Sequence, residues 1–260
     1  MDSEEILEPE AELLDDDTLL ERPQPADVLA QAQAAATSDL RDAAATFSYD
    51  GDRSAAGAHE SGLPMRRDLV LPEEDPRDAG LREVPLTETT EFSGRIFDVN
   101  RLSVRLPDGR EALRDVVRHP GAVGIVALTD DGRICLVRQY RAALDRVTVE
   151  IPAGKLDPGE DPLECARREL TEETGMVAER IAYLTTIATS VGFADELIHL
   201  YMATGLSFAG SDPDADEFIN VDLVELGQLV DAVLDGRIED AKTVVGALAC
   251  DAVAHRLGTE

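Results

Sequence analysis

The chain has 260 residues, of which 54 are acidic and 24 basic, so its formal net charge at pH 7 is −30. This charge argues against binding to nucleic acid or to an anionic membrane surface, since both are themselves negative. The three cysteines lack metal-ligand spacing, the N-terminus is acidic, and no apolar run approaches about 18 residues, which together predict a cytoplasmic protein with buried thiols.

Residues 1–85 differ in composition from the rest of the chain. They contain 22 acidic and 7 basic residues, a net of −15, with scattered prolines and an alanine- and glutamine-rich run at 30–37. A segment with so few core-forming residues is expected to be a largely disordered, acidic N-terminal extension. A docking tail and a solubilising arm are the functional alternatives for it.

Residues 86–260 have the pattern of one compact domain. Alternating or continuously apolar runs predict strands at 95–106, 112–118, 121–129, 133–139, 147–152, 181–189, 197–204 and 218–224. The turns at 107–109 and 130–132 predict that the first two strands form one hairpin and the next two another. Helices are expected at 225–235 and 240–256. Strands around one inserted helix, followed by C-terminal helices, predict an α+β fold in which helices enclose mixed sheets.

The inserted helix belongs to the stretch 154–176, which reads GKLDPGEDPLECARRELTEETGM. Asp161 is a good N-cap, the proline after it suits the first helical position, and Gly175 is the expected left-handed stop. Glu169 and Glu173 are four residues apart, so both project from one face of the helix. The helix therefore presents a cluster of carboxylates at fixed spacing.

Carboxylates that share a helix face repel one another, which costs roughly a few tenths of a kcal/mol for each pair of like charges. Arg168 is placed to pair with Glu172, four residues further on. Divalent cations explain such a cluster best, and Mg²⁺ in particular binds through a few carboxylates together with substrate phosphates. A solvated acidic helix face is the alternative interpretation of this charge run.

The same stretch fills every position of the Nudix box, G-x5-E-x7-R-E-U-x-E-E-x-G-U, in which U is a bulky aliphatic residue. The chain therefore resembles the Nudix hydrolases, and residues 86–255 are similar to their ADP-ribose pyrophosphatase branch. The segments that carry the similarity to this branch are Arg138–Arg141, Glu150–Gly154, Gly192–Glu196 and Asp216–Ile219. The resemblance implies a Nudix-type α/β/α sandwich, a homodimer, and hydrolysis of ADP-ribose to AMP and ribose 5-phosphate with Mg²⁺ or Mn²⁺.

The resemblance also assigns roles within the box. A diphosphate repels nucleophiles, so catalysis has to neutralise its oxygens and position a water. Arg168 would orient the carboxylates that do this. The implied metal ligands are the side chains of Glu169 and Glu173 and the backbone carbonyl of Ala153, with Glu160 and Glu172 in support.

A general base is expected as well, because water beside Mg²⁺ is only weakly acidic. In the branch that this chain resembles, the base comes from an acidic residue on a loop well after the box. Glu217 is the expected base, with Asp216 and Asp214 as neighbours that could substitute for it. Glu172 is the rival within the box, and an ordinary acidic loop residue is the alternative for Glu217.

Substrate contacts are expected outside the box. Arg141 follows a predicted strand and would reach the phosphates, unless it forms an ordinary surface ion pair. Arg114 and Arg118 would contact substrate, also across a dimer. Glu150 would accept a hydrogen bond from the nucleoside, or else face solvent from its strand.

One position departs from the branch. Many members carry a proline about fifteen residues after the box, where this chain has Val191. Nucleotide sugars such as GDP-mannose and dinucleoside polyphosphates therefore stay as alternative substrates, and a non-catalytic ADP-ribose sensor is the alternative outside enzyme function. His119 and His199 have no partners at catalytic spacing and are interpreted as structural.

Overall fold

The computed structural model describes residues 75–210 and 218–257, which belong to one compact unit. The acidic extension expected over 1–85 lies largely outside these residues. Within its described part, the 3-10 helix η2 (Pro76–Leu81) precedes a strand that starts at Val84, so regular structure begins before the expected domain start. None of the described helices is long and apolar enough to cross a membrane.

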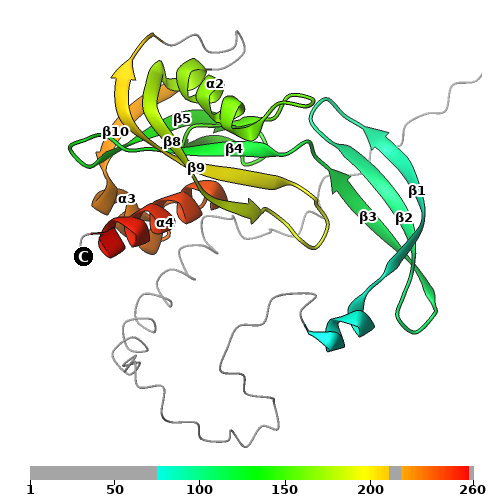
Figure 1. Cartoon of the computed structure of the whole chain (residues 1–260). Coiled ribbons are helices and arrows are strands. Elements are labelled where there is room, and N and C mark those ends of the chain that lie inside the picture. Colours follow the sequence, from blue (N-terminus) through cyan, green and yellow to red (C-terminus); the bar gives the residue numbers. More distant parts are fainter. Residues whose placement is uncertain (1–74, 211–217, 258–260) are drawn as a thin grey trace, which may run out of the picture. The chain divides into compact units, whose positions relative to one another are not determined.

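The described residues contain ten strands in three sheets (Figure 1). The strands are β1 (Val84–Ser93), β2 (Asp98–Arg105), β3 (Glu111–Arg118), β4 (Ala122–Ala127), β5 (Arg133–Arg141), β6 (Arg146–Glu150), β7 (Ala153–Lys155), β8 (Met176–Ala188), β9 (Leu197–Phe208) and β10 (Asn220–Glu225). One sheet has the order β1-β2-β3, the second β10-β5-β6 and the third β7-β4-β9-β8. Since β4 and β9 are parallel and the other pairs antiparallel, the expected mixed sheet is confirmed.

Strand pairing agrees with the sequence in the first predicted hairpin and differs in the second. β2 and β3 pair antiparallel, with Leu102 opposite Arg114. The expected pairing of 121–129 with 133–139 is limited to one antiparallel bridge beside the turn, between Leu128 and Ile134. Beyond that bridge the prediction is wrong, because β4 pairs with β7 and β9, whereas β5 pairs with β6 and β10. Residues 123–127 of β4 are all buried, and a strand covered on both faces is typical of the centre of a sheet with a parallel partner.

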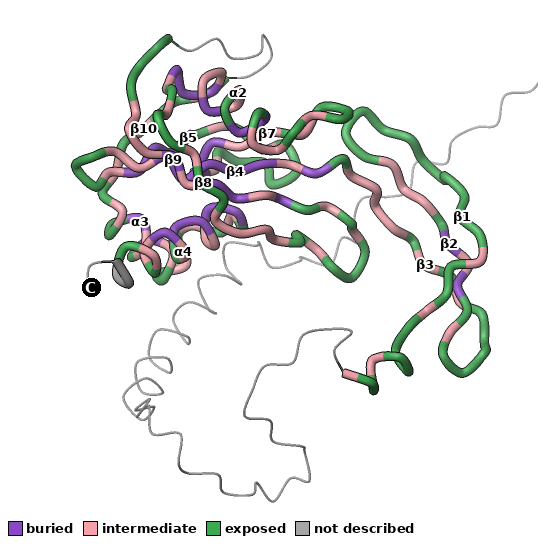
Figure 2. Tube along the Cα trace, in the orientation of Figure 1, coloured by how far each residue is buried: buried purple, intermediate pink, exposed green. Residues whose placement is uncertain are grey.

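Three helices cover the central strands on opposite faces: α2 (Pro162–Thr174), α3 (Leu226–Leu234) and α4 (Ala241–Leu257). The side chains of β4 divide between two buried clusters. Val123 and Ile125 pack with Leu170 and other residues of α2, whereas Val126 packs with residues of α3 and α4. Figure 2 shows the buried segments running along the central strands and the helices beside them. The expected α/β/α sandwich is therefore confirmed.

Helix α2 begins and ends where its sequence predicts. The Asp161 carboxylate accepts hydrogen bonds from the backbone N–H groups of Leu163, at 2.9 Å, and Glu164, at 3.3 Å, a cap that typically adds about 1 kcal/mol of stability. Gly175 ends the helix with a φ of 71°, a conformation that glycine adopts without a Cβ clash. The burial of Leu170 determines which face of α2 points into the core. It therefore also determines where the acidic residues of α2 lie.

The loop at 190–196 is fastened to the end of β3. The N–H of Asp195 donates to the carbonyl oxygen of Val117 at 3.1 Å, and the Asp195 carboxylate accepts from the N–H of His119 at 2.9 Å. These contacts bring Glu196 beside His119, just before the chain enters β4. The loop therefore forms part of the wall next to the central strands.

The three cysteines, Cys135, Cys165 and Cys250, are unpaired and buried, as expected from the sequence. Burial raises the pKa of the Cys135 and Cys165 thiols to about 12. These thiols therefore stay protonated at neutral pH and act as small apolar core residues.

Candidate functional site

A cleft of ≈ 800 Å³ lies where strands β4, β5 and β7 meet helix α2. Most of its lining is polar or charged, as expected for a site that binds an ionic ligand. The predicted site residues that line it are Arg141, Ala153, Arg168, Glu169 and Glu172. The structure thus brings the core of the predicted site together.

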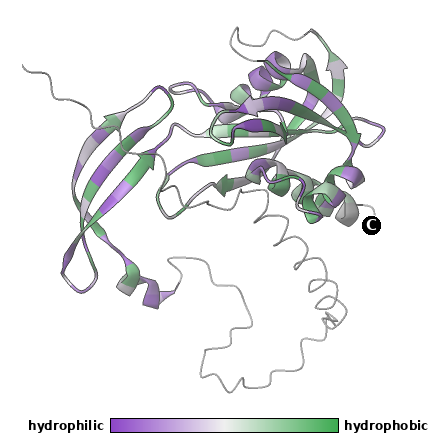
Figure 3. Ribbon diagram, turned by 180° about the vertical axis from the view of Figure 1, so that it is seen from behind, coloured by the Kyte–Doolittle hydropathy of each residue, from purple (hydrophilic) through white to green (hydrophobic). Residues whose placement is uncertain are grey.

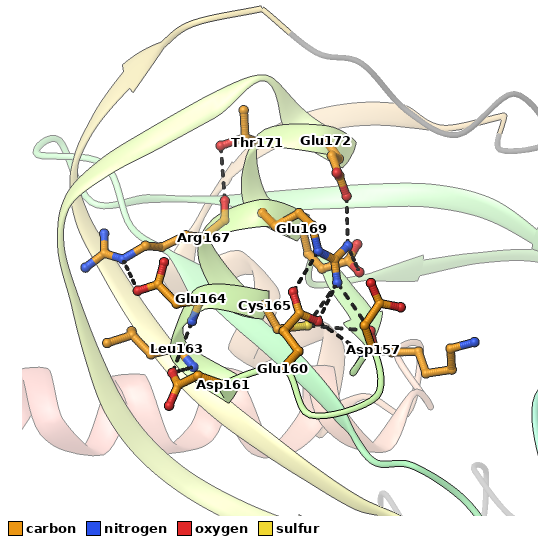
Figure 4. Close-up of polar contacts among 12 residues, drawn as sticks. Asp157, Glu160, Asp161, Leu163, Glu164, Cys165, Arg167, Glu169, Thr171 and Glu172 are labelled. Carbon is orange, nitrogen blue, oxygen red and sulfur yellow. Dashed lines mark hydrogen bonds and ion pairs between the residues drawn. The ribbon is translucent and has the colours of Figure 1, made fainter.

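Arg168 holds three carboxylates of this cluster, and Figure 4 labels all three: Glu160, Glu169 and Glu172. Its Nε and Nη2 donate to the two oxygens of Glu160, each at 2.9 Å. Its Nη1 donates to Oε1 of Glu169 at 2.7 Å and to Oε2 of Glu172 at 2.9 Å. A planar guanidinium with five donors can hold several carboxylates in this way, whereas an ammonium group is a single point charge. Glu160 does not line the cleft, and its contacts are those of an anchor for Arg168.

Two carboxylates of α2, those of Glu169 and Glu173, lie against the backbone that leads into the helix. A Cβ added at Gly154 would lie only 1.8 Å from Cδ of Glu169, so the Glu169 carboxylate rests directly on the glycine. Oε2 of the buried Glu173 accepts a hydrogen bond from the N–H of Ala153 at 2.9 Å. Both carboxylates therefore contact the short strand β7. Only glycine at position 154 leaves room for the carboxylate of Glu169.

Ion pairing keeps Glu160 and Arg168 ionised. Hydrogen bonds from Arg168, and then from the N–H of Asp157, lower the pKa of Glu160 to about 2. The hydrogen bonds to Glu160, and then to Glu169 and Glu172, raise the pKa of Arg168 above its usual range in spite of partial burial. One positive charge therefore faces three negative ones, and the excess favours the binding of a cation.

The donor set fits a hard divalent cation. Such ions take carboxylate and backbone carbonyl oxygens, and Glu169, Glu172 and the backbone of Ala153 line the same cleft. Over residues 75–210 and 218–257, no three acidic, histidine or cysteine side chains already converge on one point. Because Arg168 is bonded to Glu169 and Glu172, a cation would share these oxygens with the guanidinium. The close approach of Glu169 to Gly154 also agrees with a cation site, because it places the Glu169 carboxylate against the backbone of β7.

Glu150 lies in a buried charge network, so its predicted solvent-facing alternative is wrong. The residue is 2% exposed. Nε and Nη2 of Arg141 donate to its two oxygens at 2.8 Å and 2.6 Å, and the Thr148 hydroxyl donates to Oε1 at 2.6 Å. Lys242 Nζ donates to Oε2. With both oxygens taken, Glu150 fixes the position of Arg141, and its contacts do not support the predicted hydrogen bond to a nucleoside.

The Glu150→Gln substitution is expected to destabilise the fold most at neutral pH. Burial alone would raise the pKa of Glu150, but hydrogen bonds from Arg141 and the charge of Lys242 lower it from 4.5 to about 2. The carboxylate thus stabilises the fold above pH 4.5, and this contribution is lost as the pH falls towards 2. The difference between wild type and variant, on the order of 3 kcal/mol, should vanish over that window.

Urea unfolding at a series of pH values checks this expectation, with the exposed Glu111→Gln as the matched control. A free-energy difference between wild type and Glu150→Gln that does not change between neutral and acid pH would contradict it. The control is expected to follow the wild-type curve, because Glu111 is exposed on the first sheet.

The other predicted residues that the structure describes do not line the cleft, namely Glu150, Glu160, Glu173, Arg114 and Arg118. Nε of Arg114 donates to Glu83 at 3.0 Å. Arg118 pairs with Asp195 at 3.0 Å and lines a neighbouring pocket of ≈ 290 Å³. Contacts of these two arginines with a substrate in the cleft of their own chain are therefore not supported, which leaves the contact across a dimer as a prediction. The predicted base and its neighbours lie outside the described residues: Glu217, Asp216 and Asp214.

Several cleft residues are not apparent from local sequence patterns: Arg95, His119, Lys155, Asp157, Glu196 and Lys242. His119, expected to be structural, lines the cleft with Nδ1 3.4 Å from Oε1 of Glu196. The lysines do carry a signal in the sequence. Lys155 and Lys242 are the two lysines of a chain with 24 basic residues, and both line this cleft.

Comparison with known proteins agrees with this geometry. Residues 118–245 match the family described as the NUDIX domain. The chain is 43% identical over 165 residues to the ADP-ribose pyrophosphatase of Bacillus subtilis (strain 168), which covers 63% of this chain and 89% of that protein. It is 48% identical over 156 residues to the methanol dehydrogenase activator of Bacillus methanolicus, with coverage of 59% and 84%. It is 39% identical over 171 residues to the ADP-ribose pyrophosphatase of Mycobacterium tuberculosis (strain ATCC 25618 / H37Rv), with coverage of 65% and 83%.

A solved structure described as an ADP compounds hydrolase also resembles the chain. The two share 22% sequence identity and superpose with a TM-score of 0.61, over 68% of this chain and 97% of the other. At this identity the likeness concerns the fold alone. It agrees with the arrangement of α2, α3 and α4 about the central strands.

Proposed function

Because the chain belongs to the Nudix family, we propose that it hydrolyses the diphosphate of ADP-ribose to AMP and ribose 5-phosphate with a divalent cation. Two relatives named ADP-ribose pyrophosphatase, 43% and 39% identical to the chain, support this substrate. One structural observation carries the proposal. Glu169 lines the same cleft as Arg141 and rests on Gly154. The buried Glu173 does not line the cleft but is bonded to Ala153, which does.

Mg²⁺ is the proposed cation, and Mn²⁺ is the alternative. The residues proposed to hold it are Glu169, Glu173 and the carbonyl of Ala153, with Glu172 and Glu160 in support. Bound there, the ion would neutralise charge on the diphosphate oxygens and polarise the attacking water. Arg168 keeps Glu169 and Glu172 in place for this purpose.

Arg141 is proposed to bind a phosphate oxygen. Glu150 holds its Nε and Nη2, which leaves Nη1 available on a guanidinium that lines the cleft. A charge-assisted hydrogen bond from this group would stabilise negative charge on the diphosphate. The role of Glu150 is then to present the arginine rather than to contact the nucleoside.

We propose Glu217 as the general base, with Asp216 and Asp214 as possible substitutes. The rival, Glu172, is held by Arg168 at 2.9 Å, which supports a place in the acidic cluster rather than beside a water. Replacing Glu217 with glutamine should lower kcat and leave the Mg²⁺ concentration for half-maximal rate unchanged. A wild-type kcat in this variant, and also after Asp214→Asn and Asp216→Asn are added to it, would return the role to Glu172.

Product analysis of the purified full chain with ADP-ribose and Mg²⁺ tests the proposed function. GDP-mannose and a diadenosine polyphosphate run in parallel, because Val191 departs from the pattern of the branch. It is exposed on the loop at 190–196, which contributes Glu196 to the cleft. The expected products are AMP and ribose 5-phosphate, formed from ADP-ribose several-fold faster than either alternative is cleaved. Omitting the cation should abolish the reaction.

The other outcomes separate the alternatives. Preferred cleavage of GDP-mannose or of the diadenosine compound would keep the diphosphate chemistry and reject ADP-ribose as the main substrate. Binding of ADP-ribose without cleavage of any compound would reject hydrolysis in favour of a sensor.

We also propose that the chain acts as a homodimer in the cytoplasm. The sheet β1-β2-β3 carries both hydrophobic and hydrophilic residues along its strands (Figure 3), and several of its apolar side chains are exposed, among them Phe92 at 55% and Leu113 at 62%. Exposed apolar surface of this kind is typical of a contact with a second copy. Sedimentation of a monomer at micromolar concentration would reject the dimer.

The buried, unpaired thiols support a reducing compartment.

A further inference from the structure

Lys242 is the most deeply buried cation of the described residues and has no role in the reaction derived so far. The residue, near the start of α4, is 7% exposed. It nevertheless lines both the cleft and a second cavity of ≈ 510 Å³ beside β6. In a chain whose other basic residues, Lys155 excepted, are all arginines, a lysine at this place indicates a need for a compact ammonium group.

The contacts of Lys242 connect the C-terminal helix to the arginine of the cleft. Its Nζ donates to Oε2 of Glu150 and, at 2.9 Å, to Oδ1 of Asp240. Glu150 in turn holds Arg141 through two hydrogen bonds. Asp240 is fixed by the Thr243 hydroxyl at 2.6 Å and by the Thr243 N–H at 3.0 Å. The chain of contacts therefore runs from the rigid start of α4 to the guanidinium that lines the cleft.

The charges in this network balance. Lys242 and Arg141 are the cations, and Glu150 and Asp240 the anions. A neutral group of charges beside the cleft does not repel a diphosphate, and it lets the free edge of Arg141 act on the ligand. Without the lysine, the same group would carry one excess negative charge close to the site of an anionic substrate, in a region screened poorly by solvent.

We propose that Lys242 is a positioning residue for substrate binding: its ammonium group fixes Glu150 and balances its charge, so that Arg141 is presented to the diphosphate of a nucleoside diphosphate ligand. The inference rests on the proposed function for the identity of that ligand. It assigns the effect to the path through Glu150 and not to direct contact between Lys242 and the substrate.

A double-mutant cycle tests this path. The variants are Lys242→Met, Glu150→Gln and the double variant, and the probe is the α,β-methylene analogue of ADP-ribose, whose carbon bridge resists hydrolysis. Affinity is measured by calorimetric titration of the full chain with Mg²⁺ present. Each single variant is expected to bind the analogue about tenfold more weakly, and the double variant no more weakly than the singles, because residues that act as one unit are not additive.

Arg237→Met is the matched control. Arg237 lines the same second cavity, and replacing it removes one positive charge, as replacing Lys242 does. It pairs with Asp235 and not with Glu150 or Asp240. It is expected to bind within about twofold of wild type. If Lys242→Met is too unstable to purify, Lys242→Gln removes the same charge and keeps a donor towards Glu150.

The outcomes divide cleanly. Wild-type affinity in Lys242→Met, or a loss in the double variant equal to the product of the single losses, would overturn the inference. An equal loss in Arg237→Met would reduce it to a general effect of charge. If wild type binds the analogue and does not cleave ADP-ribose, the proposed function fails and the cycle still decides the role of Lys242. Absence of binding by wild type overturns both.

Discussion

Glu173→Gln is expected to lower the rate of ADP-ribose hydrolysis by about a thousandfold, because it removes one charge from the proposed cation site. The amide keeps the size of the side chain and an oxygen that can accept the hydrogen bond from the N–H of Ala153. The fold should therefore be retained, whereas a neutral amide is a weaker ligand for a hard cation. Initial rates over a series of Mg²⁺ concentrations give the measurement, and high Mg²⁺ should recover part of the loss.

The matched control for this prediction is Glu164→Gln. Glu164 lies on the same helix but pairs with Arg167 at 3.6 Å, whereas Glu173 accepts a hydrogen bond from Ala153, which lines the cleft. Its replacement removes the same charge and is expected to change the rate by less than about twofold. Wild-type rates in Glu173→Gln at every Mg²⁺ concentration would remove Glu173 from the cation site and leave the proposed function without its main observation.

Gly154→Ala should be nearly as damaging, with a loss of about a hundredfold in hydrolysis from a single added methyl group. The new Cβ would lie 1.8 Å from Cδ and 1.9 Å from Oε1 of Glu169, far inside van der Waals contact. The group in the way is the end of a flexible side chain, so the carboxylate can move while the backbone stays. The Glu169 carboxylate would then be displaced from Gly154, and the cation site would lose a ligand.

A comparison of rate and stability checks this account. The thermal midpoint of Gly154→Ala is expected to fall little, since the clash is relieved at the surface of the cleft, while the rate falls steeply. Gly227→Ala in α3 is the control, because nothing lies within 4 Å of the added Cβ. Alanine there is expected to stabilise the helix by up to about 1 kcal/mol and leave the rate unchanged. A full rate in Gly154→Ala would show that hydrolysis does not need Glu169 at Gly154.

Local features of this protein could be predicted from the sequence, because they depend on residues close together in the chain. Helix α2 has its N-cap at Asp161 and its stop at Gly175, and its carboxylates lie at one-turn spacing. The same holds for the hairpin of β2 and β3, which a short turn connects. Arg168 meets Glu172 four residues away for the same reason.

Long-range choices could not be predicted in this way. β4 is buried on both faces and pairs in parallel with β9, a strand far along the chain. This choice of partner is therefore not contained in the residues near β4. β1 was not expected because its residues are mostly exposed and give no clear alternation. Glu150 has an unremarkable strand position in sequence, and its meeting with Lys242 depends on how α4 packs. The role of Arg141 therefore rests on a contact that no local pattern contains.

The parallel pairing of β4 with β9 has a consequence for how the chain is made in the cell. β9 lies between β4 and β8 in its sheet, and Ala122 pairs with Ile198. During synthesis on the ribosome, β4 therefore emerges long before β9, the strand that pairs with one edge of β4, has been synthesised. Contacts so distant in sequence form slowly, and an uncovered apolar strand is prone to aggregate in the meantime. Complete translation through residue 208 is thus the step after which the nascent chain can close its central sheet.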